Sequence, residues 1–302
     1  MKKINVISYF DGISCGQQAL TKAGISYDKY YAAEIHEPSI KVTQKRFPKT
    51  IQIGDVRSQT AKDFKDIHLA LGGSPCQGFS MSGKRKGMVT TENIKVDTLE
   101  KYLQLKKDGF QFDGQSYLFW EFVRMVKEAR PRYFFLENVK MNKEWENIIT
   151  KTMGVKPHII NSSKVSGQNR LRYYWTNIPM FNEIQDKGIM FDHIIPGAVA
   201  AGTRGRQLNG EVHPNGKPKY TPCITKRDDG KANCVTTQPG TSCRYYDKDG
   251  NYKRITPEQA EVLQTIQEGY TNIEGISKTQ RLKMVGNAWT VDVIVEFLSN
   301  LK

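Results

Sequence analysis

The chain has 302 residues, of which 38% are hydrophobic and 10% aromatic, and it carries a formal net charge of +14 at pH 7. This length and composition suit one large α/β domain, or a main domain with a smaller second lobe, rather than a disordered chain. No apolar run approaches the roughly 18 residues that cross a membrane, and the N-terminal segment MKKINVISYFDG lacks the apolar core of a signal peptide, so we expect a cytoplasmic protein.

The charge and the cysteines restrict the possible partners. Lys and Arg number 45 against 31 Asp and Glu, which favours a polyanionic partner because basic side chains that neutralise phosphates release counterions. Charge alone is weak evidence, since many basic proteins bind no nucleic acid. The five cysteines are an odd number, form no CxxC pair and lack histidines at metal-ligand spacing. We predict neither disulfide bonds nor a metal site.

The first half of the chain alternates short apolar segments with amphipathic ones. We expect strands over 4–10, 30–35, 50–56 and 67–73, and helices over 16–24 and 39–47. This alternation is typical of a parallel, doubly wound α/β sheet. It resumes with a helix over 118–129 and a strand over 133–139, whose continuous apolar run suits burial on both faces. The polar stretch 84–115 between them lacks a clear core pattern and is interpreted as a mobile loop over the site.

The composition changes after residue 175. Residues 176–254 are rich in Gly, Pro, Asn and Thr, and residues 197–254 contain eleven Lys and Arg against five Asp and Glu. This predicts an irregular, basic second lobe over 176–254, with 1–175 and 255–302 forming the main domain. Helices return at 256–266, where Thr256 can cap and Pro257 fits the first turn, and at 288–301.

Three strand ends carry residues suited to a nucleoside. The first strand runs into the turn over 10–16 (FDGISCG), a geometry that brings backbone close to a nucleotide-like ligand. Glu34 follows Gly12 by 22 positions, at the end of the next strand, where it can accept hydrogen bonds from ribose hydroxyls. Asp55 ends the third strand and can accept from an adenine amino group. A carboxylate at a strand end is usually just solvated, and it is the placement of both after successive strands that favours a ligand site. Because no GxGxxG cradles a pyrophosphate, a cofactor with adenosine but no diphosphate fits better than NAD.

Cys76 is the candidate nucleophile. It follows the fourth strand within GGSPCQGFS, so it is expected in the crevice at the carboxyl end of a parallel sheet, where α/β enzymes bind ligands. The glycines and the proline favour an exposed cysteine with a fixed backbone, and the basic residues 84–86 would favour its thiolate. An isolated cysteine is more often a small buried hydrophobe, so the assignment depends on this setting.

Two further segments carry charged side chains toward the same edge of the sheet. Glu137 lies at the end of the apolar strand 133–139 and should be partly desolvated. Partial desolvation favours its protonated form, which can donate a proton to a base or share one with it. The alternative is a structural glutamate bonded to a loop. The segment 168–172 (QNRLR) is expected to place Arg170 and Arg172 on one face of a β-like segment; the alternative is an ordinary basic edge strand.

Five blocks of this chain, in this order, resemble those of the DNA cytosine-C5 methyltransferases. They are FDG at 10–12, PC at 75–76, ENV at 137–139, QNRLR at 168–172 and GNAW at 286–289. The resemblance covers 1–175 and 254–302, and several independent blocks in one order argue against chance. The FDGIxxG turn and the GNAW tail are closer to the vertebrate de novo enzymes than to typical bacterial members, which carry FxGxGG, so Ser14 and Cys15 stand where glycines are common.

The resemblance implies a Rossmann-like, S-adenosylmethionine-dependent methyltransferase fold with a smaller irregular target-recognition lobe. It implies methyl transfer to C5 of a cytosine flipped out of a specific sequence in double-stranded DNA, through a covalent bond between Cys76 and C6. Glu137 would stabilise or protonate N3, and Arg170 and Arg172 would hold the base and the thiolate.

The resemblance and the basic composition also assign binding residues. The expected cofactor pocket consists of Phe10, Asp11, Gly12, Glu34, Ile35, Asp55, Val56, Pro75, Leu118, Asn287 and Trp289. The expected DNA contacts are Ser80, Lys84, Arg85, Arg204, Arg206, Lys226, Arg227, Arg244 and Arg254. No stable protein partner is implied, although a cognate restriction endonuclease would be a partner by function, and association with the nucleoid is expected in a prokaryotic or phage setting.

Four other functions compete with this interpretation. A catalytically silent homologue that binds DNA would be signalled by loss of Cys76 or Glu137, and both are present. An RNA cytosine methyltransferase of the same fold stays open. An NAD-dependent oxidoreductase is disfavoured because the diphosphate loop is missing, and an amino-methylating DNA enzyme because no D/N-P-P-Y/F motif occurs.

Overall fold

The structure is a computed structural model in which the chain divides into two compact units. It describes residues 3–60, 63–75, 78–79, 87–180, 182–212, 214, 216, 218–237 and 243–301, with backbone only for 203–209 and 218–223. The first unit comprises Met1–Asn161, Leu171–Glu183 and Val291–Lys302, and the second Ser162–Arg170 and Ile184–Thr290.

A seven-stranded sheet in the order β3-β2-β1-β4-β5-β7-β6 forms the centre of the first unit. Its strands are β1 (Ile4–Tyr9), β2 (Tyr27–Ala33), β3 (Ile51–Gln52), β4 (Ile67–Gly72), β5 (Tyr133–Val139), β6 (His158–Asn161) and β7 (Leu171–Thr176). Strands β1 to β5 are parallel, and β7 runs antiparallel to both β5 and β6. The predicted doubly wound, Rossmann-like α/β sheet is confirmed.

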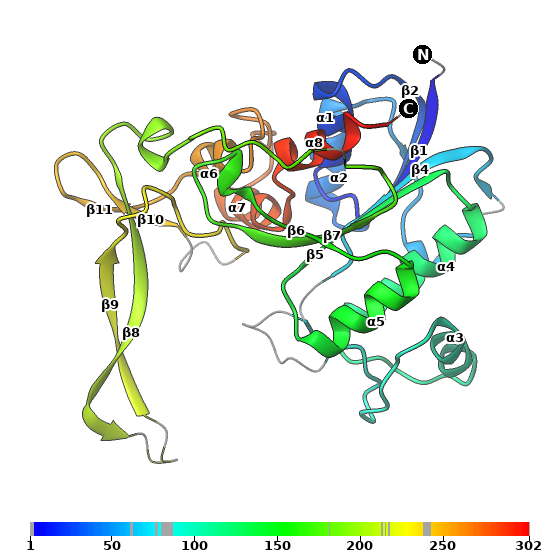
Figure 1. Cartoon of the computed structure of the whole chain (residues 1–302), viewed down its shortest axis with the longest axis horizontal. Helices are drawn as coiled ribbons and strands as arrows, with labels where there is room; N and C mark the ends of the chain where they lie inside the picture. Colours follow the sequence, from blue (N-terminus) through cyan, green and yellow to red (C-terminus); the bar gives the residue numbers. More distant parts are fainter. Residues whose placement is uncertain are drawn as a thin grey trace. The chain divides into compact units, whose positions relative to one another are not determined.

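Helices cover both faces of this sheet (Figure 1). They are α1 (Cys15–Lys22), α2 (Glu37–Arg46), α3 (Leu99–Lys107), α4 (Phe119–Ala129), α5 (Lys143–Met153) and α8 (Val291–Leu298). In Figure 1, α1, α2 and α8 lie above the sheet, and α4 and α5 lie below it. Packing is tight where α4 meets the sheet, because a Cβ on Gly72 would lie 2.6 Å from the ring of Phe122. The sheet is therefore buried on both faces, as its apolar strands predict.

The stretch interpreted as a mobile loop is folded in its described part. Residues 87–115 contain helix α3, and Val96 and Tyr102 are almost fully buried in the core of the first unit. The indole N–H of Trp120 donates to the carbonyl of Val96 at 3.2 Å. The loop interpretation is wrong for these residues, because a nine-residue helix is shorter than the window over which helical periodicity becomes visible. Residues 84–86 lie outside the described part.

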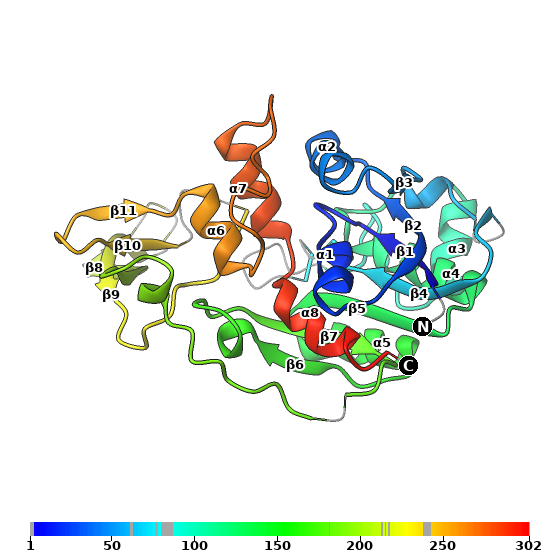
Figure 2. The same ribbon diagram turned by 90° about the horizontal axis from the view of Figure 1, so that it is seen from above.

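The second unit combines a small antiparallel sheet with two helices. Its strands and helices are β8 (Val199–Val212), β9 (Pro218–Lys226), β10 (Arg244–Tyr246), β11 (Tyr252–Arg254), α6 (Pro257–Leu263) and α7 (Lys278–Asn287). Helices α6 and α7 pack side by side (Figure 2). Thr256 caps α6 by accepting from the amide of Gln259, and Pro257 is its first residue, as predicted.

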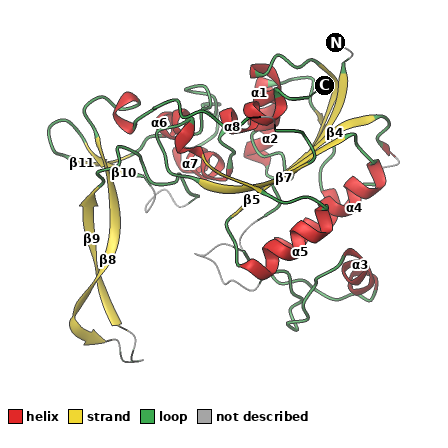
Figure 3. Ribbon diagram, viewed as in Figure 1, coloured by secondary structure: helices red, strands yellow, loops and turns green. Residues whose placement is uncertain are grey.

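A long hairpin extends from the small sheet (Figure 3). Strand β10 pairs with β8 only at Val199–Ala201, whereas β9 pairs with β8 from Ala201 onward to Val212. Beyond Ala201, β8 and β9 therefore have only each other as described hydrogen-bonding partners. We call the described residues 202–212 and 218–225 the ribbon.

The packing units do not coincide with the expected functional division into 1–175 with 255–302 and 176–254. Residues 162–170 and 255–290 pack with the second unit. The division by function stays a prediction. In the part of the chain that the structure describes, none of the helices has the length and apolar character required to span a bilayer.

Candidate active site

The carboxylate of Glu34 ties together the ends of β1 and β2. The amide of Gly12 donates to Oε2 at 2.7 Å, and the amides of Ile35 and His36 donate to Oε1 at 2.8 Å each. Gly12 has a φ of +59°, and nothing lies within 4 Å of where a Cβ would stand. The side chain of Ile35 is 62% exposed although it is apolar. These strand ends thus combine open space, a carboxylate and an exposed apolar surface.

The side chain of Asp11 is buried rather than exposed at the surface of the turn that contains Gly12. Its carboxyl is buried and accepts from the hydroxyl of Tyr30 at 2.8 Å. Burial raises the pKa of Asp11 to about 6. A Cβ on Gly16 would stand 2.6 Å from the same hydroxyl, so this position requires glycine. Sequence reasoning missed Tyr30 because no local pattern relates it to the turn.

Two residues of this turn that are not glycine, one of them at a position where glycine is common, have positive φ angles. Ser14 has a φ of +60° and Phe10 a φ of +58°, both in the left-handed region that favours glycine. The Ser14 hydroxyl accepts a hydrogen bond from the side-chain amide of Gln17 at 2.7 Å. Cys15 is buried as the first residue of α1. The departure from the FxGxGG pattern is therefore accommodated by backbone strain at Ser14.

Asp55 caps the short helix η1 (Val56–Ser58) at the end of β3. It accepts from the backbone amide of Arg57 at 2.9 Å, and its Oδ2 pairs with the Arg57 guanidinium at 2.5 Å. Hydrogen bonds from Arg57 lower the pKa of Asp55. Val56 is buried, and Leu118 is partly buried at the end of η3 (Ser116–Leu118).

Cys76 lies outside the described residues, as do Ser80, Lys84 and Arg85. The backbone on either side of Cys76 is anchored. The side-chain amide of Asn138 donates to the carbonyl and the hydroxyl of Ser74, at 3.2 and 3.0 Å. The amide of Gly78 donates to the hydroxyl of Ser116 at 2.9 Å. Pro75 is partly buried. The sequence analysis did not identify Ser74 or Ser116. The position of Asn138 directly after Glu137 was a usable signal that a polar contact forms at this edge of the sheet.

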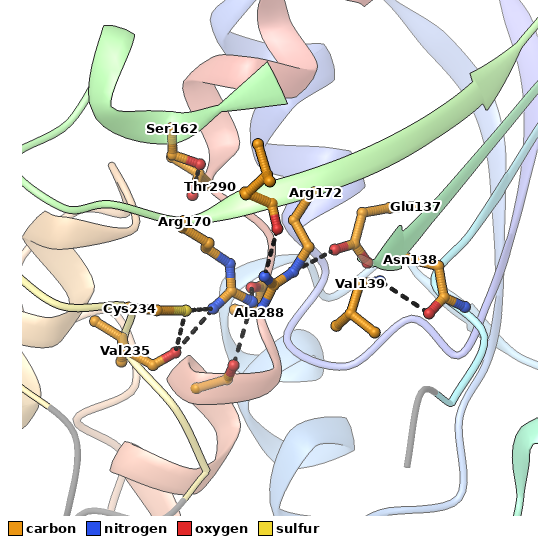
Figure 4. A network of polar contacts seen from close by, with 12 residues as sticks. Glu137, Asn138, Val139, Ser162, Arg170, Arg172, Cys234, Val235, Ala288 and Thr290 are labelled. Carbon is orange, nitrogen blue, oxygen red and sulfur yellow. Dashed lines mark hydrogen bonds and ion pairs between the residues drawn. The ribbon is translucent and has the colours of Figure 1, made fainter. Parts of the chain in front are cut away.

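Glu137 and Arg172 form an ion pair between neighbouring strands (Figure 4). Arg172 Nε lies 3.0 Å from Glu137 Oε1, and the two side chains are only 15% and 12% exposed. Strand pairing produces this contact, because β5 and β7 run antiparallel with Val139 opposite Arg172. The guanidinium balances the charge of a nearly buried carboxylate at the carboxyl end of β5.

Arg170 has a different environment from Arg172. It is 3% exposed, and its guanidinium donates to the carbonyls of Val235 and Ala288 at 2.8 Å each (Figure 4). Strand β7 begins at Leu171. Arg172 therefore lies on the expected β-like segment, whereas Arg170 precedes strand β7 and packs within the second unit.

The segment 286–289 lies in the second unit and is closely packed. A Cβ on Gly286 would stand 2.3 Å from the carbonyl carbon of Thr236, so backbone approaches backbone there and only glycine fits. Asn287 ends α7 and is exposed, whereas Trp289 is 8% exposed.

The expected DNA contacts in the second unit differ in how firmly they are held. Arg227 is bound by Asp229 and donates to Asn233 at 2.8 Å, and this pairing lowers the pKa of Asp229 to about 2. Lys226 lies 5.3 Å from the ring centre of Tyr246, Arg244 donates to the hydroxyl of Tyr252 at 2.9 Å, and Arg254 is exposed in β11. Arg204 and Arg206 lie in β8, where only the backbone is described.

A family model described as C-5 cytosine-specific DNA methylase matches residues 4–178. The chain belongs to this family. Among curated relatives, the orphan methyltransferase M.Rho11sI of Bacillus phage rho11s is 32% identical over 142 residues, which are 46% of this chain and 24% of that enzyme. The chain thus matches about a quarter of this relative's length.

Two solved structures resemble the whole fold. The methyltransferase EhMeth of Entamoeba histolytica has a TM-score of 0.67 at 16% identity, with 99% of this chain and 98% of that chain covered. The Dnmt2 methyltransferase of S. pombe has a TM-score of 0.66 at 15% identity, with 98% of both chains covered. At such low identity these likenesses show the fold.

Proposed function

We propose that this chain is a DNA cytosine-C5 methyltransferase that uses Cys76 as its covalent nucleophile and S-adenosylmethionine as its methyl donor. The observation that carries this proposal is the tether between two strand ends. Asn138, adjacent to Glu137, binds Ser74, two residues before Cys76. The candidate acid and the loop of the candidate nucleophile are therefore held together by a buried hydrogen-bonded contact.

The ends of β1, β2 and β3 fit S-adenosylmethionine. The space above Gly12 is open, Ile35 presents an exposed apolar surface, and the Glu34 carboxylate, which accepts from three backbone amides, retains acceptor capacity. Glu34 would bind the ribose and Asp55 the adenine amino group. The remaining proposed cofactor contacts are Phe10, Val56, Pro75, Leu118, Asn287 and Trp289. When bound, this cofactor supplies an electrophilic methyl group on a sulfonium. Asp11, which is buried, would support the turn from below.

The residues of the chain divide the chemistry among them. The Cys76 thiolate forms a bond to C6 of a flipped-out cytosine, while Glu137 shares a proton with N3 so that the ring becomes an enamine. C5 then takes the methyl group, loses its own proton to a base, and the returning electron pair breaks the bond between C6 and sulfur. Arg172 holds the Glu137 carboxylate in place through their ion pair. Arg170, which binds backbone carbonyls, would instead position the segments around it.

We further propose that residues 176–254 select the DNA sequence. The ribbon is an antiparallel two-stranded hairpin, one of the elements that the major groove of B-DNA admits. Arg204 and Arg206 are the proposed base contacts. The other proposed DNA contacts are Lys226, Arg227, Arg244 and Arg254 in this segment, and Ser80, Lys84 and Arg85 near Cys76. Most contacts of this kind reach phosphates and position the protein without reading sequence.

Transfer of tritiated methyl groups tests the proposal. The purified chain is incubated with labelled S-adenosylmethionine and either genomic DNA or total RNA, and the products are mapped by bisulfite sequencing. We expect label in DNA, at cytosines of one short motif, and a covalent adduct with a duplex that contains 5-fluorocytosine. Label confined to RNA would establish the RNA alternative, and binding of DNA without transfer would establish a silent homologue.

A further inference from the structure

A buried carboxylate in α4 gathers three partners in the first unit. Glu121 is fully buried. Its Oε1 accepts from the Tyr102 hydroxyl at 2.5 Å and pairs with Lys106 at 2.6 Å, and its Oε2 pairs with Arg124 Nε at 2.7 Å. A buried charge is tolerated only when it is paired and hydrogen-bonded in this way. Glu121 therefore fixes the direction of the Arg124 side chain.

Arg124 connects this carboxylate to η1. Its Nη2 donates to the carbonyl of Val56 at 3.1 Å and to that of Gln59 at 2.9 Å. Asp55 caps the amide end of the same short helix. The turn is thus held at its amide end by Asp55 and at its carbonyl end by Arg124, across more than 60 residues of sequence.

We propose that Arg124, oriented by Glu121, is a positioning residue that sets the Asp55–Val56 turn for recognition of the adenine ring. This inference rests on the proposed cofactor site. A three-residue helix has too few internal hydrogen bonds to define its own geometry. A planar guanidinium can bind one carboxylate and two carbonyls at once, whereas the ammonium of a lysine, which has a shorter side chain, cannot. Arg57 holds the Asp55 carboxylate directly, and Arg124 of α4 holds the backbone of the turn from which both residues project.

The test compares two ligands that differ only at the N1–C6 edge of the purine, where the inosyl ligand has a carbonyl and an N1–H in place of the adenine amino group and the N1 lone pair. Dissociation constants of S-adenosylhomocysteine and S-inosylhomocysteine are measured by calorimetry for the full-length chain and for Arg124→Lys. We expect wild type to prefer the adenosyl ligand, and the variant to bind it about tenfold more weakly, as expected for loss of a charge-assisted hydrogen bond. The inosyl ligand should lose about twofold or less, because it lacks the group that Asp55 would bind.

Glu128→Gln is the matched control, since Glu128 pairs with the Nη1 of Arg124 at 3.0 Å, whereas the contacts to η1 come from Nη2. It should leave both constants unchanged. Thermal unfolding of each variant measures general loosening. Equal loss for the two ligands, or no loss in folded Arg124→Lys, would overturn the inference. Wild type that binds neither ligand would instead refute the proposed function.

Tyr102→Phe keeps the test valid if Arg124→Lys does not fold. It removes one hydrogen bond to Glu121 and leaves every charge in place. The preference for the adenosyl ligand should fall by about twofold, because Glu121 is held less firmly. An unchanged preference in this variant also overturns the inference.

Discussion

The strand ends of the first unit and the described backbone of the ribbon in the second unit differ in how much of the chain holds them in place. Glu34, Glu137 and Asn138 are each fixed by partners from another part of the chain. The ribbon pairs only with itself beyond Ala201 among the described residues. Groups that act on a reacting atom must be positioned before the reaction, because reorganisation in the transition state costs rate. A reading surface can instead adapt as it meets base edges.

The nucleophile should give the largest effect. Cys76→Ser is expected to lower methyl transfer by about 10³-fold or more, since a hydroxyl is a far weaker nucleophile than a thiolate. Cofactor and DNA binding should persist, because the change removes little volume. Tritium transfer and gel-shift assays measure the two properties. Cys223→Ser is the control, and transfer by Cys76→Ser at the wild-type rate would refute the covalent mechanism.

Substitution of Glu137 should give the second largest loss of activity. Glu137→Gln keeps the shape but cannot share a proton, so we expect a loss of about 10² to 10⁴-fold in kcat, the usual contribution of general acid–base catalysis. The KM for cofactor should barely change. Single-turnover kinetics with Glu144→Gln as the exposed control measure this effect. A variant that loses only DNA affinity would make Glu137 a binding residue.

Removal of Glu34 should weaken the cofactor site. Glu34→Ala is expected to reduce S-adenosylmethionine affinity by about 1 to 3 kcal/mol, the value of hydrogen bonds to a charged acceptor. DNA binding without cofactor should stay the same. Calorimetry compares it with Glu37→Ala in the first turn of α2. Unaltered affinity in Glu34→Ala would remove this residue from the site.

Substitutions in the ribbon should change the DNA sequence that is methylated rather than the rate of the chemical step. Arg204→Ala or Arg206→Ala is expected to relax one position of the methylated motif by about 1 to 3 kcal/mol if it reads guanine, whereas loss of a phosphate contact weakens all sequences alike. Methylome sequencing of each variant separates these outcomes. A chimera that carries residues 176–254 of a relative with another motif should methylate the relative's motif. An active chimera that keeps the original motif would contradict the assignment.

The smallest effect concerns the buried Asp11. Its folded pKa of about 6 lies above the ordinary 3.8, so wild type loses stability as the pH rises from about 4 to about 6. Asp11→Asn removes this loss, and its free energy of unfolding relative to wild type should rise by about 1 to 2 kcal/mol between pH 4 and pH 7. Urea denaturation across this range measures it. A difference that is independent of pH would show that Asp11 is not protonated preferentially in the folded state.

The sequence alone determined the sheet and the places where chemistry is expected. Strands and their ends are local features, because a short apolar run followed by glycine or a carboxylate is visible within ten residues. For this reason Glu34, Asp55 and Glu137 were correctly placed at the ends of β2, β3 and β5. The assignment of Cys76 also came from its local setting, and its role stays a prediction.

Only the tertiary structure decided which partner each of these residues has. Ser74 lies 64 residues from Asn138, and Val56 lies 68 residues from Arg124. Arg170 and Arg172 are two positions apart, yet one binds backbone carbonyls and the other a carboxylate. Hydrogen-bond partners of buried groups depend on how distant segments pack, because a buried polar atom finds its partner among whatever atoms lie beside it in space. No periodicity along the chain carries that information.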